Sequence, residues 1–371
     1  MDLIETFKWF HQHPEISHHE YDTTAKICEI LDDENIPVTR RGLNTGCIAT
    51  IASDNPGKTI GFRVDIDALA IEEKSECDYK SLNPGVAHLC GHDFHITVGL
   101  AVAIALHNSK DKWNGTVKII FQAAEETGIG AKDVINHPLL EDICAYVGLH
   151  ADPTNPVGTL GLRVGAVCAA VDRFVLTIDG VGCHGAHPDD GKDPIVAAVA
   201  IANALPTIIS RNMNTFRPSL LSLTRIESGN TWNVVPSQAT LEGTFRTMDA
   251  NDRKKISKRI ESLAINIANG YGCQCECNII HGAGVVFNDA ILVATATKVA
   301  DKCSLMVVEE EQSMGGDDFS YYSESKPSVY VKVGTGVGPS IHQSNFMIDL
   351  AALTPASYYF TELLISLVNN R

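Results

Sequence analysis

The segment TVKIIFQAAEE, residues 116–126, decides the fold class of this chain. It begins as a short apolar run rich in β-branched residues, which predicts a buried strand, and it ends in the adjacent carboxylates Glu125 and Glu126. Two neighbouring carboxylates repel each other unless cations hold them. We therefore expect a strand whose carboxyl end carries ionic chemistry.

The rest of the first half alternates between strand-like and helix-like segments. Strands are predicted at 48–52, 59–67 and 145–150, and helices at 22–31 and 95–107. This alternation predicts an α/β domain with a mostly parallel sheet flanked by helices. Ligands in such domains bind beyond the carboxyl ends of the strands.

The pattern changes near Ala169. The predicted elements then follow in the order β-α-β-β-α-β, at 173–179, 194–209, 220–227, 239–246, 251–269 and 273–279. This order predicts an inserted α+β lid domain of the split-βαβ, ferredoxin-like type. We expect a catalytic domain at 1–168 and 282–371 and a lid domain at 169–281, a division that suits a chain of 371 residues.

Composition excludes several classes of partner. A formal net charge of -16 argues against nucleic acid and anionic membranes, which require clustered basic residues. The longest apolar run, 195–202, is too short for a membrane span, and the first residues lack the basic and apolar regions of a signal peptide. Eleven cysteines, an odd number without a secretion signal, indicate reduced thiols and a cytoplasmic protein.

Metal-ligand residue types stand at four separated places, each of which ends or follows an apolar run. They are Cys90 with His92, the pair Glu125–Glu126, His150 and His342. Thiolate, imidazole and carboxylate together suit zinc, manganese or cobalt, and a spare carboxylate suits a general base. Taken singly, Cys90 could be a small buried residue and each histidine a hydrogen-bonded one; together they form a shell of five ligands for two ions.

Other polar residues have two interpretations each. Asp65 could orient a ligand histidine from outside the metal shell, or it could cap the next helix. His184 or His187, in a glycine-punctuated turn, could donate to an oxyanion, or the turn could simply cap a helix. Arg246 could bind a substrate carboxylate or be a solvated strand residue, and Asn233 offers an amide nearby in the sequence of the lid.

Three further cysteines, Cys273, Cys275 and Cys277, alternate along one predicted strand and so share a face. They could suggest a metal site. Polar residues between them favour a half-buried strand that carries small core side chains.

Ordered motifs along nearly the whole chain closely resemble the M20 metallopeptidase family, in its amidohydrolase branch of hippurate hydrolases, N-acyl-amino-acid amidohydrolases and auxin-conjugate hydrolases. The motifs are His13–Glu15, Arg63–Leu69, Cys90–His95, Gln122–Glu126, Gly148–His150, the turn at His184, Asn233–Pro236, Gly243–Thr247, Asp317–Ser320, and His342 with Phe346.

The resemblance implies a two-metal centre with Glu125 as general base and the ligands Cys90, His92, Glu126, His150 and His342. It also implies that the lid residues His184, Asn233 and Arg246 hold the substrate carboxylate or the developing oxyanion, often across a homodimer made by the lid domains.

Our hypothesis is a metal-dependent amidohydrolase. It would use two divalent ions, zinc, manganese or cobalt, to hydrolyse the amide bond of a small N-acyl L-amino acid into a carboxylate and a free amino acid. A dipeptidase or aminopeptidase of the same chemistry is the first alternative. A non-catalytic binding protein on the same fold is the second, and the intact Glu125 beside five intact ligands argues against it.

Overall fold

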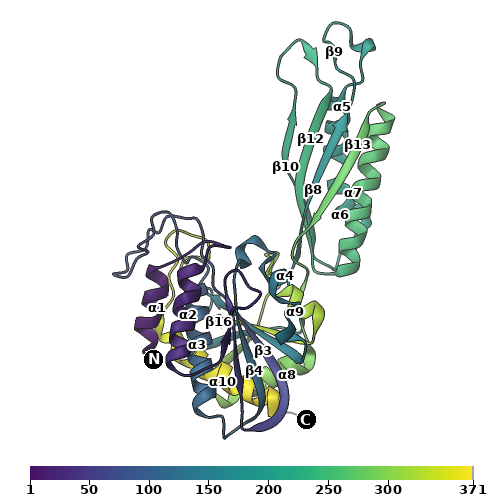
Figure 1. Ribbon diagram of the computed structural model, residues 1–371. Coiled ribbons are helices and arrows are strands. Elements are labelled where there is room, and N and C mark those ends of the chain that lie inside the picture. The colour runs from purple at the N-terminus through teal and green to yellow at the C-terminus, as the bar shows by residue number, and fades with distance from the viewer. Residues whose placement is uncertain (370–371) are drawn as a thin grey trace. The chain divides into compact units, whose positions relative to one another are not determined.

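The computed structural model describes residues 1–369, which form two compact units (Figure 1). Of the described residues, the first unit comprises 1–167, 286–311 and 317–369, and the second comprises 168–285 and 312–316. The sequence-based boundaries assign 168, 282–285 and 312–316 to the first unit instead. Segment 312–316 packs with the second unit because the backbone N–H of Ala169 donates to the carbonyls of Ser313 and Gly315, both at 3.0 Å.

The first unit is built on an eight-stranded sheet of order β1-β2-β4-β3-β5-β16-β6-β15. The strands are β1 (Val38–Thr39), β2 (Cys47–Ala52), β3 (Asn55–Asp65), β4 (Asn114–Gln122), β5 (Ile143–Asp152), β6 (Thr159–Leu162), β15 (Met306–Glu309) and β16 (Ser328–Gly334). At its centre β4, β3, β5 and β16 are neighbours and run parallel, so their carboxyl ends meet at one edge. The predicted α/β class with a mostly parallel sheet is confirmed.

Helices flank this sheet. They are α1 (Leu3–Gln12), α2 (Tyr21–Asp33), α3 (His92–Asn108), α4 (Gly130–Val134), α8 (Ala290–Lys302), α9 (Ser320–Ser325) and α10 (Leu353–Asn369). Helix α3 is apolar on nearly all sides and lies in the core of the unit, which fixes the position of its first residue, His92.

The second unit has an antiparallel sheet of order β10-β12-β8-β13 with helices packed on one face. Its elements are β8 (Ala170–Asp179), α5 (Pro194–Ala204), α6 (Pro206–Asn212), β10 (Ser219–Ser228), β12 (Gln238–Thr247), α7 (Ala250–Gly270) and β13 (Gln274–His281). This is the split-βαβ arrangement that the sequence predicts.

Two small ladders complete the strands. In the second unit β9 (Cys183–His184) pairs with β11 (Val234–Val235), at the end of the sheet where β8 stops and β12 starts. The other ladder joins β7 (Gly165–Cys168) to β14 (Val286–Asn288).

The predicted helix 194–209 is two helices, because Pro206 lacks the N–H that would continue α5. Together, Pro194–Asn212 is long and apolar enough to cross a membrane by length and composition alone. Core helices of globular proteins meet the same criterion, and Ala197, Ile201 and Ile208 from this stretch pack into the core of the second unit.

Candidate metal centre

Four neighbouring parallel strands bring the predicted ligands of the first unit to one edge of its sheet. Glu125 and Glu126 follow β4, and His150 lies near the end of β5. His342 comes from the segment after β16, and Cys90 and His92 come from the end of the long loop between β3 and α3. Chain order does not place these segments together; the parallel topology does.

A glycine sets the spacing of Cys90 and His92. Gly91 has φ of 85° and is the N-cap of α3, a left-handed conformation that glycine adopts without strain. A Cβ at this position would lie 2.7 Å from the Cβ of Ala151 on β5. The turn at Gly91 therefore brings the backbone against β5 and directs the two flanking side chains toward the strand ends.

The donor atoms of the predicted ligands lie close together. Cys90 Sγ is 3.5 Å from His150 Nε2, and His342 Nε2 is 3.4 Å from Glu126 Oε1. Donor atoms lie within 4.8 Å of one another in each of three overlapping groups: Cys90–His92–His150, Cys90–Glu126–His342 and His92–Glu125–Glu126. The structure thus brings all five predicted ligands and Glu125 into one cluster.

Two buried polar atoms of the cluster lack a hydrogen-bond partner in the described part of the chain. These atoms are His92 Nε2 and Glu126 Oε1. The rings of His92 and His150 are held from their other nitrogen, because Nδ1 of His92 donates to the carbonyl of Asp67 at 2.8 Å and Nδ1 of His150 to that of Ala151 at 2.7 Å. Imidazole Nε2 atoms, a thiol and carboxylates that lie together, with only the His342 side chain about half exposed, fit divalent metal ions.

Electrostatics distinguish Glu125 within the cluster. Burial, followed by the nearby carboxyls of Asp317, Asp318 and Glu126, raises the pKa of Glu125 well above its usual range. Burial also raises the pKa of the Cys90 thiol. Both groups are therefore costly to ionise until positive charge is added, which a divalent cation would supply.

A fully buried arginine, Arg63, lies beneath the cluster and binds the acidic side chains next to it. Arg63 donates to Asp65 Oδ2 and Asp318 Oδ1, both at 2.6 Å, and to Gln122 Oε1 at 3.0 Å. Asp65 also hydrogen-bonds His95 Nδ1. The helix-capping interpretation of Asp65 is wrong, because the N-cap of α3 is Gly91 and the carboxylate of Asp65 bonds the side chains of Arg63 and His95.

Sequence reasoning missed the residue that orients His92. That role belongs to Asp67, whereas Asp65 Oδ2 is 3.7 Å from His92 Nε2. Asp67 also accepts the backbone N–H of Glu126 at 3.0 Å, so one residue positions two ligands. The alternation of Arg63, Asp65 and Asp67 was the available signal, but it does not show that the backbone carbonyl of Asp67 bonds His92.

The second unit carries the remaining predicted residues at opposite ends of its sheet. His184 is exposed on β9 and accepts the N–H of Ala186 at 3.0 Å, and Asn233 directly precedes β11, the partner of β9. Arg246 lies at the far end of β12, is half-buried and donates to the carbonyl of Met314 at 2.7 Å. Within one copy, His184 and Asn233 are therefore brought together, and Arg246 is not near them.

Cys273, which directly precedes β13, and Cys275 and Cys277 in β13 face the core of the second unit. Cys273 is buried in the core of the second unit, and Cys275 and Cys277 pack against that core. The core interpretation is confirmed.

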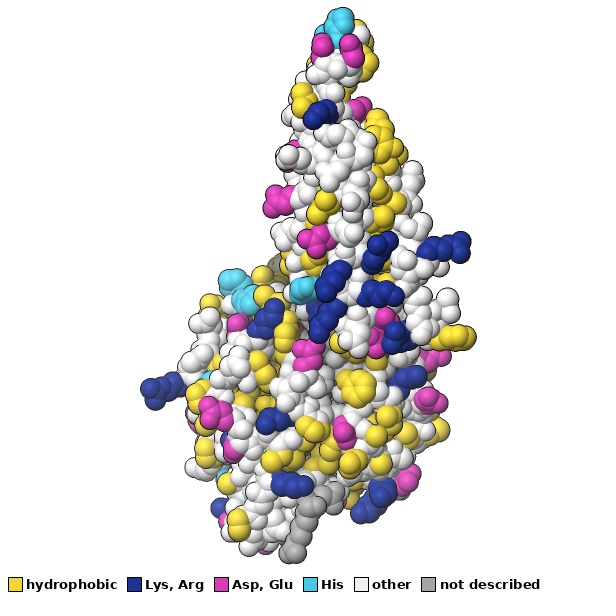
Figure 2. Space-filling view, turned by 90° about the vertical axis from the view of Figure 1, so that its right-hand side faces the viewer, with side chains coloured by type: hydrophobic (Ala, Val, Ile, Leu, Met, Phe, Trp, Pro, Cys, Tyr) yellow, Lys and Arg dark blue, Asp and Glu magenta, His cyan; other side chains and the backbone are white. Residues whose placement is uncertain are grey.

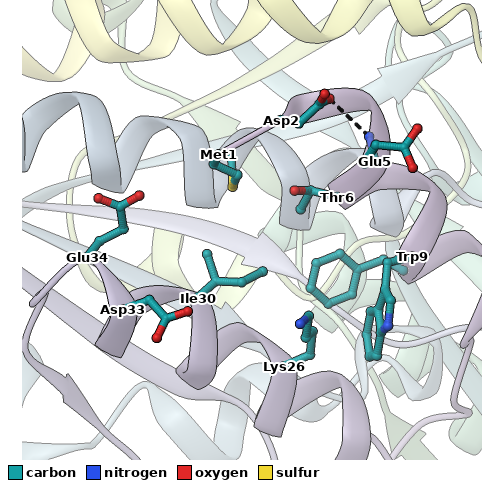
Figure 3. Close-up of a pocket in the computed structure, with 10 residues that line it drawn as sticks. Met1, Asp2, Glu5, Thr6, Trp9, Lys26, Ile30, Asp33 and Glu34 are labelled. Carbon is teal, nitrogen blue, oxygen red and sulfur yellow. Dashed lines mark hydrogen bonds between the residues drawn. The ribbon is translucent and has the colours of Figure 1, made fainter.

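A pocket of about 400 Å³ lies between α1 and α2 (Figure 3). Its lining includes Glu5, Trp9 and Lys26 and contains none of the candidate ligands. It plays no part in the centre described above.

Comparisons with known proteins place the chain in a family. The model of peptidase family M20/M25/M40 matches residues 61–366. The chain belongs to the M20 family. An N-acetyl-L-cysteine deacetylase of Bacillus subtilis is 38% identical over 97% of this chain and 86% of its own length. An N-acetyldiaminopimelate deacetylase of Pediococcus pentosaceus is 30% identical over 95% of this chain and 94% of its own length.

Solved structures agree with this assignment. A dinuclear metal-binding peptidase of the M20 family from Bacillus subtilis superposes with a TM-score of 0.90 at 36% identity, covering 99% of this chain and 97% of that one. A protein described as an aminohydrolase from methicillin-resistant Staphylococcus aureus gives 0.95 at 29% identity, covering 99% and 96%. The chain is a metal-dependent amidohydrolase of this family.

Proposed function

We propose that this enzyme hydrolyses the amide bond of small N-acyl L-amino acids. The observation that carries the proposal is Glu125, a half-buried carboxylate with a raised pKa beside the unsatisfied atoms His92 Nε2 and Glu126 Oε1. The names of the relatives, deacetylases of N-acetylcysteine and N-acetyldiaminopimelate, support an acylated amino acid as substrate class.

We assign two divalent ions to the donors of Cys90, His92, Glu126, His150 and His342. When bound, the ions polarise the substrate carbonyl and make water a better nucleophile near neutral pH. The Bacillus subtilis relative of known structure is a dinuclear metal-binding peptidase, which supports the count of two. Zinc, manganese and cobalt all suit this mixture of thiolate, imidazole and carboxylate.

Glu125 acts as the proton carrier of the reaction. It takes a proton from the attacking water and returns it to the leaving nitrogen, so one carboxyl group serves both steps. Its neighbour Glu126 has its backbone fixed by Asp67 and its side chain near His342, so the two carboxylates have different partners.

Three residues of the second unit are assigned to the substrate. His184 and Asn233 donate to the oxyanion or the carboxylate, and Arg246, whose guanidinium has donors beyond the one used by Met314, binds the free carboxylate. From Gln238 to Arg246 the strand β12 spans about 26 Å at the usual rise per residue. A small substrate held by Arg246 therefore cannot also touch His184 of the same copy.

We infer that a second copy of the chain supplies the missing residue, in a homodimer made by the second units. Two features of this unit support the inference. Strand β10 is an edge of its sheet and exposes Ile226, and α5 exposes Ile195, Val196 and Val199 by 39–49%. Hydrophobic side chains are visible on the surface of this unit (Figure 2). Unpaired strand edges and exposed apolar side chains favour pairing between copies.

We place the enzyme in the cytoplasm. All eleven cysteines carry free thiols, which suits a reducing compartment. Fractionation of cells that express the tagged chain tests this assignment.

A substrate panel tests the proposed reaction. N-acetyl, N-benzoyl and indole-acetyl amino acids and unblocked dipeptides are assayed for release of amino acid with added zinc, manganese or cobalt. The proposal expects turnover of N-acyl amino acids. Turnover of dipeptides alone would instead establish a peptidase that requires a free α-amino group.

A further inference from the structure

A second cluster of metal-ligand side chains lies outside the candidate metal centre. His11 is the penultimate residue of α1, and Glu73 and Cys77 lie in the irregular segment between β3 and α3. One donor atom of each lies within 4.8 Å of the others. None of the three belongs to the centre described above, and sixty-odd residues separate His11 from the other two.

Two of the separations between these donor atoms match those of a tetrahedral metal site, and the third pair lies within 4.8 Å. His11 Nε2 is 3.2 Å from Glu73 Oε1, and Cys77 Sγ is 3.7 Å from the same oxygen. Around a tetrahedral zinc ion with ordinary bond lengths, the nitrogen–oxygen and sulfur–oxygen separations are about 3.4 Å and about 3.6 Å. Ser75 Oγ lies 3.4 Å from Cys77 Sγ and contacts the same Glu73 oxygen, so a fourth oxygen donor is at hand.

A second observation concerns the other ring nitrogen of His11. Asp93 Oδ2 lies 2.6 Å from His11 Nδ1, and both side chains are buried. A carboxylate on the far nitrogen fixes the tautomer and directs Nε2 toward the metal, as is usual for metal-bound histidines. At the candidate centre His92 and His150 are held in the same way by backbone carbonyls.

Without a metal ion, the side chains of this cluster are held together by hydrogen bonds from a protonated His11. Burial of His11 opposes its protonation, but its hydrogen bonds to Asp93, Cys77 and Glu73 together raise its pKa to about 12. A divalent ion would replace two protons, one from His11 Nε2 and one from the Cys77 thiol. The exchange leaves the net charge of the cluster unchanged, so no new charge is buried.

We propose that His11, Glu73 and Cys77 bind a third divalent ion, of the zinc type, separate from the catalytic pair. Thiolate, imidazole and carboxylate are the donors that zinc prefers. The ion joins the end of α1 to the loop that leads into α3. Because Asp93 directly follows His92, the ion also steadies the start of α3 through His11 and Asp93.

Metal stoichiometry tests the proposal. Metal-free protein is loaded with excess zinc, passed through a desalting column and analysed for elements. We expect three ions per chain in the wild type, and the loss of one ion in Cys77→Ala and in the isosteric Glu73→Gln. Cys144→Ala, which removes an exposed thiol, is the matched control and keeps three. Equal zinc content in the wild type and both cluster variants would show that the cluster is only hydrogen-bonded and would overturn the proposal.

A cadmium experiment separates this site from the catalytic centre. In a Cys90→Ser background the candidate centre has no thiolate, so a thiolate-to-cadmium absorption band must come from another cysteine. We expect the band to persist in Cys90→Ser and to disappear in Cys90→Ser/Cys77→Ala. No band in the Cys90→Ser protein would overturn the third site and leave the catalytic pair unaffected. A band that requires Cys77, together with no amidase activity in the zinc-loaded wild-type enzyme, would retain the third site and reject the proposed function.

Discussion

At the scale of single residues, adjacent side chains of the same type have different surroundings. The backbone of Glu126 is fixed by Asp67, and its side chain lies beside His342. Burial, followed by the nearby carboxyls of Asp317, Asp318 and Glu126, raises the pKa of Glu125. The left-handed backbone of Ala124, with φ of 58°, precedes the pair and sets how it leaves β4. This local geometry supports the proposed roles, in which Glu126 binds metal and Glu125 carries protons.

The substitution Glu125→Gln separates these two roles. It keeps the volume of the side chain and removes the base, so we expect full metal content and a kcat lower by roughly 10²–10⁴-fold, the usual contribution of a positioned acid–base group. Glu126→Gln should lose metal first. Elemental analysis beside steady-state kinetics checks both, and loss of metal from the Glu125 variant alone would reverse the assignment.

Arg246 should act on binding of the substrate carboxylate. We expect Arg246→Ala to raise KM by roughly 10–100-fold for N-acyl amino acids, as loss of hydrogen bonds to a charged group does, and much less for their amides. Arg225→Ala is the control, since Arg225 is an exposed strand arginine of the same unit that pairs with Glu227. Equal effects on acids and amides would make Arg246 a structural residue that holds segment 312–316.

At the scale of elements, the sequence predicts the central strands of the sheet but not its short strands β1, β6 and β15. Apolar runs placed the motifs at the carboxyl ends of β4 and β5, where the structure has them. The local pattern of apolar and polar residues does not predict the order of the strands in the sheet. It also does not predict the hydrogen bonds between segment 312–316 and Ala169. It also could not show that Asp67, and not Asp65, orients His92, because that choice depends on where α3 lies against the sheet.

The turn at Gly91 connects helix α3 to the candidate metal centre. The substitution Gly91→Ala tests whether this turn positions Cys90 and His92. A positive φ costs an alanine roughly 1–2 kcal/mol, and the new Cβ would also overlap Ala151. We expect lower thermal stability and reduced metal content, because relief of the overlap moves Cys90 and His92. Gly158 is the control: its φ is 88°, but an added Cβ would have no neighbour within 4 Å. The Gly158→Ala variant should therefore lose stability and keep its metal. Identical metal content in the two variants would contradict this account.

At the scale of the whole molecule, the unsatisfied donors make both activity and stability depend on metal. Prolonged chelation should abolish turnover and lower the unfolding temperature, because an ion that binds only the folded state stabilises it. Zinc, manganese or cobalt added singly should restore both. Calorimetry and activity assays on the same samples check this. Full activity in protein shown to be metal-free by elemental analysis would refute the two-metal proposal.

The proposed homodimer predicts that two inactive variants restore each other. His184→Ala lacks the oxyanion donor and should lose roughly 10²–10³-fold in kcat, and Glu125→Gln lacks the base. In a mixed dimer, the His184→Ala chain keeps Glu125 and receives His184 from its partner, so one of two sites is complete. Random exchange of equal amounts should therefore make about a quarter of all sites active. The mixture is unfolded, refolded together and assayed against each variant refolded alone. If the mixture is no more active than the separate variants, then His184 does not act across a dimer, and its role must lie within its own chain or be structural.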